Sequence, residues 1–131
     1  MKNMETAKTT KKTGDFGENI ARAFLESKGY TIIAQNFRFK RREIDIIACD
    51  NEYIVFIEVK TRTNIVFSLP SQSVSAAKQN SIISAAQGWL FENETALQPR
   101  FDVIEIYRNI KTDKNYVRHI QSAFILTEKN S

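Results

Sequence analysis

Hydrophobic and polar residues alternate along this chain in patterns that predict two helices and five strands. Residues 15–28 carry Phe16, Ile20 and Phe24 at intervals of four, which is typical of an amphipathic helix, and Gly29 follows as a stop signal. A short β-branched run predicts a strand at 30–34, and two stronger strand patterns at 43–49 and 53–62 are joined by a tight turn. The pattern over 73–91 is helical, and two further strands are predicted at 101–107 and 116–121.

This order, α-β-β-β-α-β-β, is typical of an α/β fold in which a central mixed sheet is flanked by helices. The chain has 131 residues, of which 42% are hydrophobic and 26% charged, and this composition fits a single globular domain. We expect a flexible basic tail at 1–13, one domain at 14–125 and a short tail at 126–131. Neither a transmembrane pattern nor a secretory signal is found, so we expect a cytoplasmic protein without a membrane partner.

The charge and the cysteine content of the chain exclude only a few classes of protein. The formal net charge is +4, but most of it comes from the lysine-bearing first 13 residues, so the total says little about partners. A single cysteine and a single histidine exclude a disulfide scaffold and a zinc finger. More informative is a local basic run, which is either a solvated loop or a patch that faces phosphates: Arg38, Lys40, Arg41 and Arg42.

Candidate chemistry lies on the predicted hairpin of 43–49 and 53–62. Alternation along the second strand places Glu58 and Lys60 on the same face. A turn at 51–52 sets a register that pairs apolar residues along the other face, namely Ile44 with Val59, Ile46 with Ile57 and Ala48 with Val55. The same register places Asp45 opposite Glu58 and Glu43 opposite Lys60.

Directly opposed carboxylates are destabilising unless something compensates their charge. Mg²⁺ is a suitable compensator because it needs few protein ligands and accepts phosphate oxygens, and Lys60 could then orient the attacking water or neutralise developing charge. The alternative is an ion cluster in which Glu43 and Lys60 pair and one carboxylate is protonated. The position of Asp45 opposite Glu58 favours the metal site.

Three further polar residues lie near hydrophobic arcs of the predicted helices. Lys78 and Gln79 fall inside the apolar arc of the second helix, so they need partners. Either they reach the carboxylate site, or Lys78 snorkels and Gln79 bonds to backbone, and both interpretations stay open. For Glu18 the pattern favours an ordinary pair with Arg22, four residues on, over a supplementary metal ligand.

The order of motifs resembles that of the YraN-like family of uncharacterised bacterial proteins. The segments that carry the resemblance are Gly14-x-x-Gly17-Glu18, Glu43-Ile44-Asp45, Phe56-Ile57-Glu58-Val59-Lys60-Thr61-Arg62, Lys78-Gln79, Arg100-Phe101-Asp102-Val103 and His119-Ile120-x-x-Ala123-Phe124. That family is similar to archaeal Holliday junction resolvases, which implies a restriction-endonuclease-like fold. One departure is Arg42, where the family usually carries glycine.

The resemblance implies a nuclease site of the PD-(D/E)xK type. It makes Asp45, Glu58 and the Val59 carbonyl the metal ligands, Lys60 the catalytic lysine, Gln79 the supporting helix residue and Glu18 the acid of the first helix. The expected function is a Mg²⁺- or Mn²⁺-dependent endonuclease on DNA, possessing the structure selectivity of a junction resolvase. The residues expected to bind nucleic acid are Arg38, Lys40, Arg41, Arg42, Arg62 and Lys78.

The sequence leaves the oligomeric state and the catalytic activity open. Resolvases of similar fold are symmetric dimers, which implies a homodimer, although no feature of the sequence identifies an interface. The alternative function is a non-catalytic nucleic-acid-binding module or adaptor of the same fold, because fold alone does not settle activity.

Overall fold

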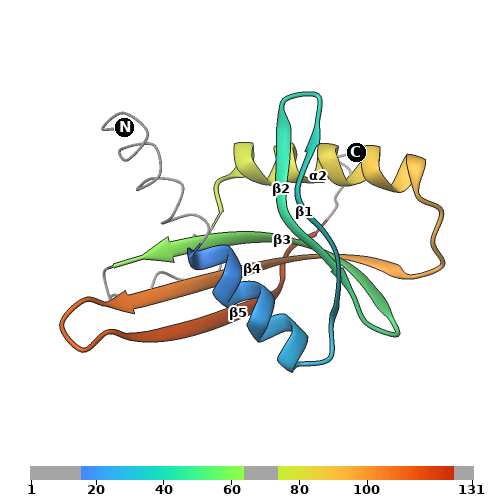
Figure 1. The fold of residues 1–131 in the computed structure, drawn as a ribbon. Helices are drawn as coiled ribbons and strands as arrows, with labels where there is room; N and C mark the ends of the chain where they lie inside the picture. The colour runs from blue at the N-terminus through green and yellow to red at the C-terminus, as the bar shows by residue number, and fades with distance from the viewer. Residues whose placement is uncertain (1–15, 64–73, 126–131) are drawn as a thin grey trace, which may run out of the picture.

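The computed structural model describes residues 16–63 and 74–125 (Figure 1). A first helix occupies residues 16–27, and the elements that follow it are β1 (Thr31–Phe39), β2 (Arg42–Cys49), β3 (Tyr53–Arg62), α2 (Ala76–Glu92), β4 (Gln98–Asn109) and β5 (Lys114–Phe124). The predicted order α-β-β-β-α-β-β is therefore confirmed. Both predicted tails, 1–13 and 126–131, lie outside the described residues, as do residues 14–15 of the predicted domain. No helix within the described ranges is long and apolar enough to cross a membrane.

The strands form one five-stranded mixed sheet in the order β1-β2-β3-β4-β5. Neighbouring strands are antiparallel except for β3 and β4, which run parallel because the chain crosses over through α2 between them. The predicted hairpin register is confirmed near the turn, where Ile46 pairs with Ile57 and Ala48 with Val55. Apolar pairing thus fixed this register, because a slip by one residue would expose the whole buried face.

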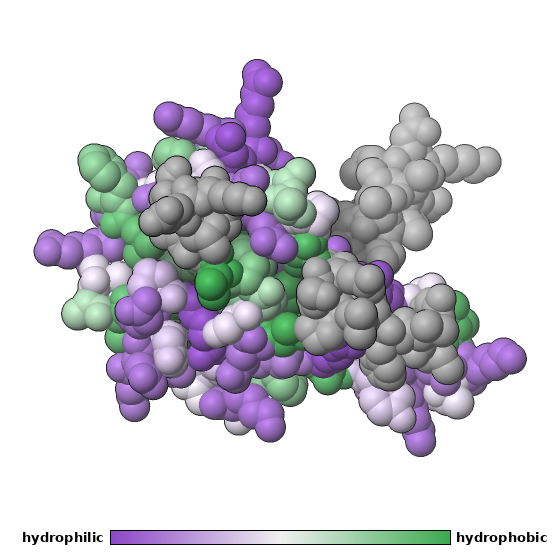
Figure 2. Space-filling model, turned by 180° about the vertical axis from the view of Figure 1, so that it is seen from behind, coloured by the Kyte–Doolittle hydropathy of each residue, from purple (hydrophilic) through white to green (hydrophobic). Residues whose placement is uncertain are grey.

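Each face of the sheet is covered by one helix (Figure 1). The first helix packs Ala21 and Leu25 against a cluster on β2, β3 and β4 that includes Ile57. On the opposite face, α2 packs Trp89 against the ring of Phe56, with 5.9 Å between ring centroids. Figure 2 shows the α2 side, where hydrophilic side chains project around the rim and hydrophobic ones lie near the centre.

The ends of several elements differ from the sequence-based boundaries. Strand β1 extends to Phe39 rather than to residue 34, because it pairs with β2 over its whole length. Helix α2 begins at Ala76 rather than 73, since Ser75 caps it by accepting a hydrogen bond from the Lys78 backbone N–H. Strands β4 and β5 are also longer than predicted, because they pair with each other from residue 101 to the turn.

The hairpin of β1 and β2 continues beyond the edge of β3 and packs against α2 (Figure 1). Its contact point is Gly88, where an added Cβ would lie 2.5 Å from the Phe39 ring. A side chain on this turn of α2 would therefore push the hairpin away. The hairpin is consequently a supported arm rather than a free loop.

Candidate active site

The predicted carboxylate pair lies where β2 leaves β3. Within the described residues the β2–β3 ladder ends at Ile46 and Ile57, so the predicted pairs of Ile44 with Val59 and of Glu43 with Lys60 are not formed. Instead, the Asp45 carboxylate accepts a hydrogen bond of 2.8 Å from the Val59 backbone N–H. Asp45 thus takes the place of a backbone partner and lies beside Glu58.

Glu58 is buried at this point and has an unusual ionisation. Burial, a hydrogen bond with Asp45 and repulsion from the Asp45 charge raise the pKa of Glu58 to about 8, against a smaller opposing effect of Lys78. Its Oε2 accepts no hydrogen bond from the described residues, although the Lys78 Nζ lies 3.4 Å away as an ion-pair partner. Glu58 therefore keeps its proton near neutral pH, and the ion pair with Lys78 is the described contact of its buried Oε2.

Two further groups of β3 lie near the two acids, namely the Val59 carbonyl and the Lys60 side chain. The N–H and C=O of one residue lie at the same edge of a strand, so the Val59 carbonyl lies on the side where Asp45 has displaced β2. Lys60 is half-buried, shares the sheet face of Glu58, and forms no ion pair with any described residue. A lysine two residues from a buried acid is suited to donate a proton to a substrate or to neutralise negative charge on it.

The first helix brings Glu18 toward this edge through a close approach at Gly17. A Cβ on Gly17 would clash with the Thr61 Oγ1, so glycine allows the helix to approach β3 closely here. Arg22 forms an ion pair with Glu26 at 3.5 Å, and the expected pair of Glu18 with Arg22 stays a prediction. The side chain of Glu18 also contacts Asn36 of β1.

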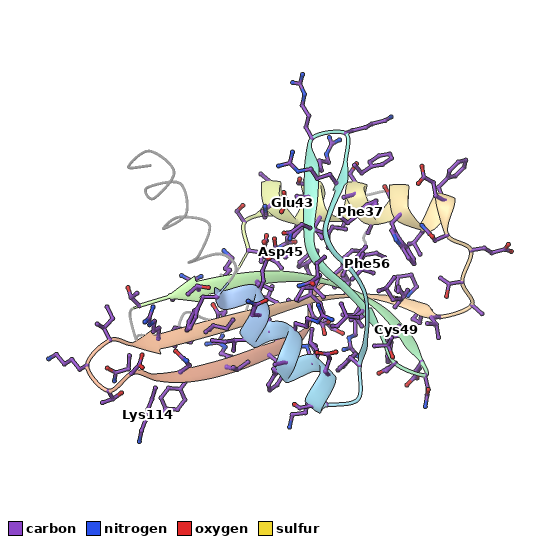
Figure 3. The ribbon with its side chains drawn as sticks, in the orientation of Figure 1. Phe37, Glu43, Asp45, Cys49, Phe56 and Lys114 are labelled. Carbon is purple, nitrogen blue, oxygen red and sulfur yellow. The ribbon has the colours of Figure 1, made fainter. Side chains whose placement is uncertain are left out.

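Asn36 joins two of the acids and was missed by sequence reasoning. Its amide nitrogen lies 3.3 Å from Glu18 Oε2, and turning the amide brings that nitrogen to 2.9 Å from Glu18 Oε1 and 3.2 Å from Glu43 Oε1. Asn36 has φ of 53°, a left-handed conformation that asparagine tolerates better than most residues. The only sign of this contact in the sequence was the asparagine within a strand pattern. In Figure 3, Glu43 and Asp45 are labelled along β2, with Glu43 nearer the tip of the hairpin.

The two polar residues of α2 behave differently. Lys78 reaches the site and pairs with Glu58, as the functional interpretation predicts. Gln79 donates a hydrogen bond of 3.0 Å to the Val74 carbonyl, which is the structural interpretation. The described geometry therefore gives Gln79 a role in the first turn of α2 and does not bring it to the carboxylates.

The basic run forms the tip of the β1–β2 arm. All four of its side chains are exposed, and Arg38 pairs with Glu43 at 3.3 Å. Lys40 and Arg41 have φ of 48° and 69°, the paired left-handed conformation of a two-residue hairpin turn that usually needs glycine or asparagine. Arg42 lies in extended β2, so this position does not require the glycine of the family pattern.

The donor set fits a Mg²⁺ or Mn²⁺ ion that is completed by water or phosphate. Asp45, Glu58 and the Val59 carbonyl offer oxygen donors, and Glu58 Oε2 is buried with no hydrogen bond from the described residues, although the Lys78 Nζ lies beside it. No group of three or more His, Cys, Asp or Glu side chains in the described residues is arranged to hold an ion. A cavity of about 400 Å³ lies elsewhere, between α2 and the start of β4, and no acid lines it among the described residues.

Comparison with known proteins identifies the family. Residues 17–106 match the model of uncharacterised protein family UPF0102. The chain belongs to this family. A UPF0102 protein of Caldanaerobacter subterraneus subsp. tengcongensis is 48% identical over 89% of the chain and 98% of its own length. UPF0102 proteins of Clostridioides difficile and Clostridium botulinum are 45% and 42% identical, each over 87% of the chain and 97% and 94% of their lengths. The suspected YraN-like membership is confirmed.

Proposed function

We propose that this UPF0102 protein is a Mg²⁺- or Mn²⁺-dependent endonuclease that hydrolyses DNA phosphodiester bonds. The observation that supports it most is the contact of half-buried Asp45 with buried Glu58, whose pKa is raised to about 8, at the point where β2 leaves β3. Lys60 lies on the same face, two residues from Glu58. Two acids and a lysine around a free strand edge are the groups that metal-assisted phosphodiester hydrolysis needs.

Each residue has a defined part in this proposal. Asp45, Glu58 and the Val59 carbonyl would hold the cation, which when bound supplies Lewis acidity and lowers the pKa of a coordinated water. Lys60 would hold the attacking water or stabilise the charge that develops on the phosphate. Lys78 would leave Glu58 and face the phosphate, and Glu18 would support the site through Asn36.

The exposed tip of the arm supports nucleic acid as the substrate. Strand rise places Arg41 roughly 13 Å along β2 from Asp45, within the reach of one strand of a duplex. Two non-glycine residues in left-handed conformation cost on the order of 1–2 kcal/mol each, so the fold keeps basic side chains at a position where glycine would be more stable. A backbone-phosphate contact explains that choice.

The test compares cleavage of plasmid, single-stranded DNA and a four-way junction, with Mg²⁺, Mn²⁺ or EDTA. We expect cleavage by the wild type with either metal and loss of at least about 100-fold in Asp45→Asn, Glu58→Gln and Lys60→Met. Glu52→Gln and Lys114→Met change exposed residues of the same types and should retain full activity. Cleavage that survives Asp45→Asn would refute the proposed site.

A second candidate is a nucleic-acid-binding module that does not cleave. It is favoured by the ion pair of Lys78 with Glu58, which neutralises this acid without a metal. In that case isothermal titration would detect no Mg²⁺ binding, and DNA binding would be equal with Mg²⁺ and with EDTA. Removal of the tip charges would weaken binding, whereas Asp45→Asn would not.

A further inference from the structure

The β1–β2 arm is a two-stranded ribbon beyond the end of the β2–β3 ladder. In the described chain, residues 37–44 pair only with one another, namely Phe37 with Ile44, Arg38 with Glu43 and Phe39 with Arg42. One face of this ribbon is apolar and packs against α2 and its core cluster. In Figure 1 the turn between β1 and β2 extends past α2. The arm therefore presents a supported tip to a partner.

The tip carries basic side chains on its end and on both of its faces. Lys40 and Arg41 form the turn itself. Arg42 is paired with Phe39 and so shares the face that packs against α2, whereas Arg38 precedes Phe39 in β1 and points to the opposite face. All four basic side chains are exposed. Positive charge thus surrounds the end of the ribbon.

This arrangement fits a concave partner that has negative charge on two sides. Glu43 is the one acid among residues 38–43, so positive charge is in excess at the tip. A single nucleic-acid strand offers one row of phosphates, which one face of the ribbon could contact. A groove of a duplex has a phosphate backbone along each wall, so both faces of the ribbon can contribute. The distribution of charge therefore favours duplex DNA.

The dimensions of the ribbon select the major groove. One layer of a sheet with its side chains is about 10 Å thick. The major groove is about 12 Å wide and admits a two-stranded ribbon, whereas the minor groove is only about 6 Å wide. The major groove is about 8.5 Å deep, and Asp45 lies roughly 13 Å along β2 from Arg41. With the tip in the groove, Asp45 therefore stays outside it, beside the phosphate backbones.

We propose that the tip of the arm enters the major groove of duplex DNA, with Lys40 and Arg41 toward the base edges. Arg38 and Arg42 then face the two backbones. The inference rests on the proposed function and names its substrate class, which is duplex DNA cleaved in a backbone that borders the occupied groove. Lysine and arginine hydrogen-bond to the guanine edge in this groove, which accounts for two basic residues in a turn that favours glycine.

The experiment measures binding of a fluorescent duplex by anisotropy, with EDTA to prevent cleavage. One duplex carries ordinary cytosines, and a second of the same sequence carries glucosylated 5-hydroxymethylcytosine. Groups at C5 lie in the major groove, so the sugar blocks it without altering the backbone charge. The wild type should bind the glucosylated duplex, and the single strand, at least about tenfold more weakly than the ordinary duplex. Equal affinity for the two duplexes, or for the single strand and the ordinary duplex, overturns the proposal.

Variants of the tip separate contacts to bases from contacts to phosphates. Lys40→Asn combined with Arg41→Gly suits the geometry of the turn, so the fold is kept. This double variant should bind the ordinary duplex about tenfold more weakly and lose most of the discrimination against glucose. Arg42→Gln should instead lower the slope of log K against log salt by about one and keep the discrimination. The control, Lys111→Asn with Lys114→Gln, removes two exposed lysines near the β4–β5 turn and should change neither quantity.

Two failures are distinguishable. A wild type that neither binds nor cleaves any DNA refutes the proposed function. A wild type that binds DNA but does not distinguish the two duplexes refutes only the groove assignment. A tip double variant that keeps the full discrimination has the same consequence, because another element then occupies the groove.

Discussion

Replacing Glu58 with glutamine should abolish the pH dependence that this residue gives to stability. Glutamine keeps the shape and a hydrogen-bonding group but cannot ionise. In the folded protein the pKa of Glu58 is raised from 4.5 to about 8, so the native state binds this proton more tightly than the unfolded chain does. The contribution of Glu58 to stability is therefore complete below about pH 4.5, falls as pH rises, and levels off above about pH 8.

The magnitude follows from the size of this shift. Each pH unit between the two pKa values lowers the free energy of unfolding by about 1.4 kcal/mol, which gives about 5 kcal/mol over the whole range. The side chain is only 11% exposed, so solvent screening reduces this little. Between pH 5 and pH 7.5 the wild type should lose about 3 kcal/mol relative to Glu58→Gln.

Urea unfolding in EDTA, followed by the fluorescence of Trp89, measures this difference. Trp89 is the single tryptophan and lies 5.9 Å from the Phe56 ring, so its emission reports on the core beneath Glu58. Glu52→Gln, at an exposed turn position, should run parallel to the wild type. Parallel curves for the wild type and Glu58→Gln from pH 5 to 8 would refute the assigned ionisation.

The same assay detects the proposed cation. Mg²⁺ at about 100 times its dissociation constant should add about 2.7 kcal/mol to the wild type at pH 8 and nothing to Glu58→Gln. The gain should fade toward pH 6, because the ion must displace the proton that Glu58 keeps.

Three further outcomes are expected. Asp102→Asn should destabilise by about 3–5 kcal/mol in urea unfolding, because it leaves the buried Arg100 guanidinium without its carboxylate. Gly88→Ala should cost about 1–3 kcal/mol through its clash with the Phe39 ring, and a Phe39→Ala background should remove most of that loss. Arg41→Gly should raise stability by about 1 kcal/mol by relieving its left-handed conformation, while weakening DNA binding in anisotropy.

Local pattern was enough to predict the centre of the sheet. Strand β3 was predicted with its observed ends, Tyr53 and Arg62, because alternation is clear and a turn precedes it. Strand β1 was predicted only to residue 34, because its second half contains Asn36 and charged residues that weaken a strand pattern. Tertiary contacts extend this strand, namely its pairing with β2 and the packing of Phe39 on Gly88.

The candidate site, too, was predicted in part from local pattern and depends in part on tertiary contacts. The apolar register brought Asp45 and Glu58 together in the prediction, but the actual contact depends on the end of the ladder at Ile46, which no local pattern encodes. Glu105 could not be placed beside Lys60 before the parallel register of β3 and β4 was known, because that pairing spans the whole of α2.

The energetics of Glu58 bear on the choice between a nuclease and a binding module. A buried acid that titrates near pH 8 lowers stability at neutral pH, and glutamine would fill the same space and still hydrogen-bond to Asp45 without that loss. A module that only binds DNA through its basic arm gains nothing from this acid, since a buried carboxyl group offers phosphate no favourable charge. A cation site does gain, because Glu58 releases its proton when the ion binds, and the ion then offsets its repulsion from Asp45. The loss of stability at this one position therefore favours the metal-dependent nuclease.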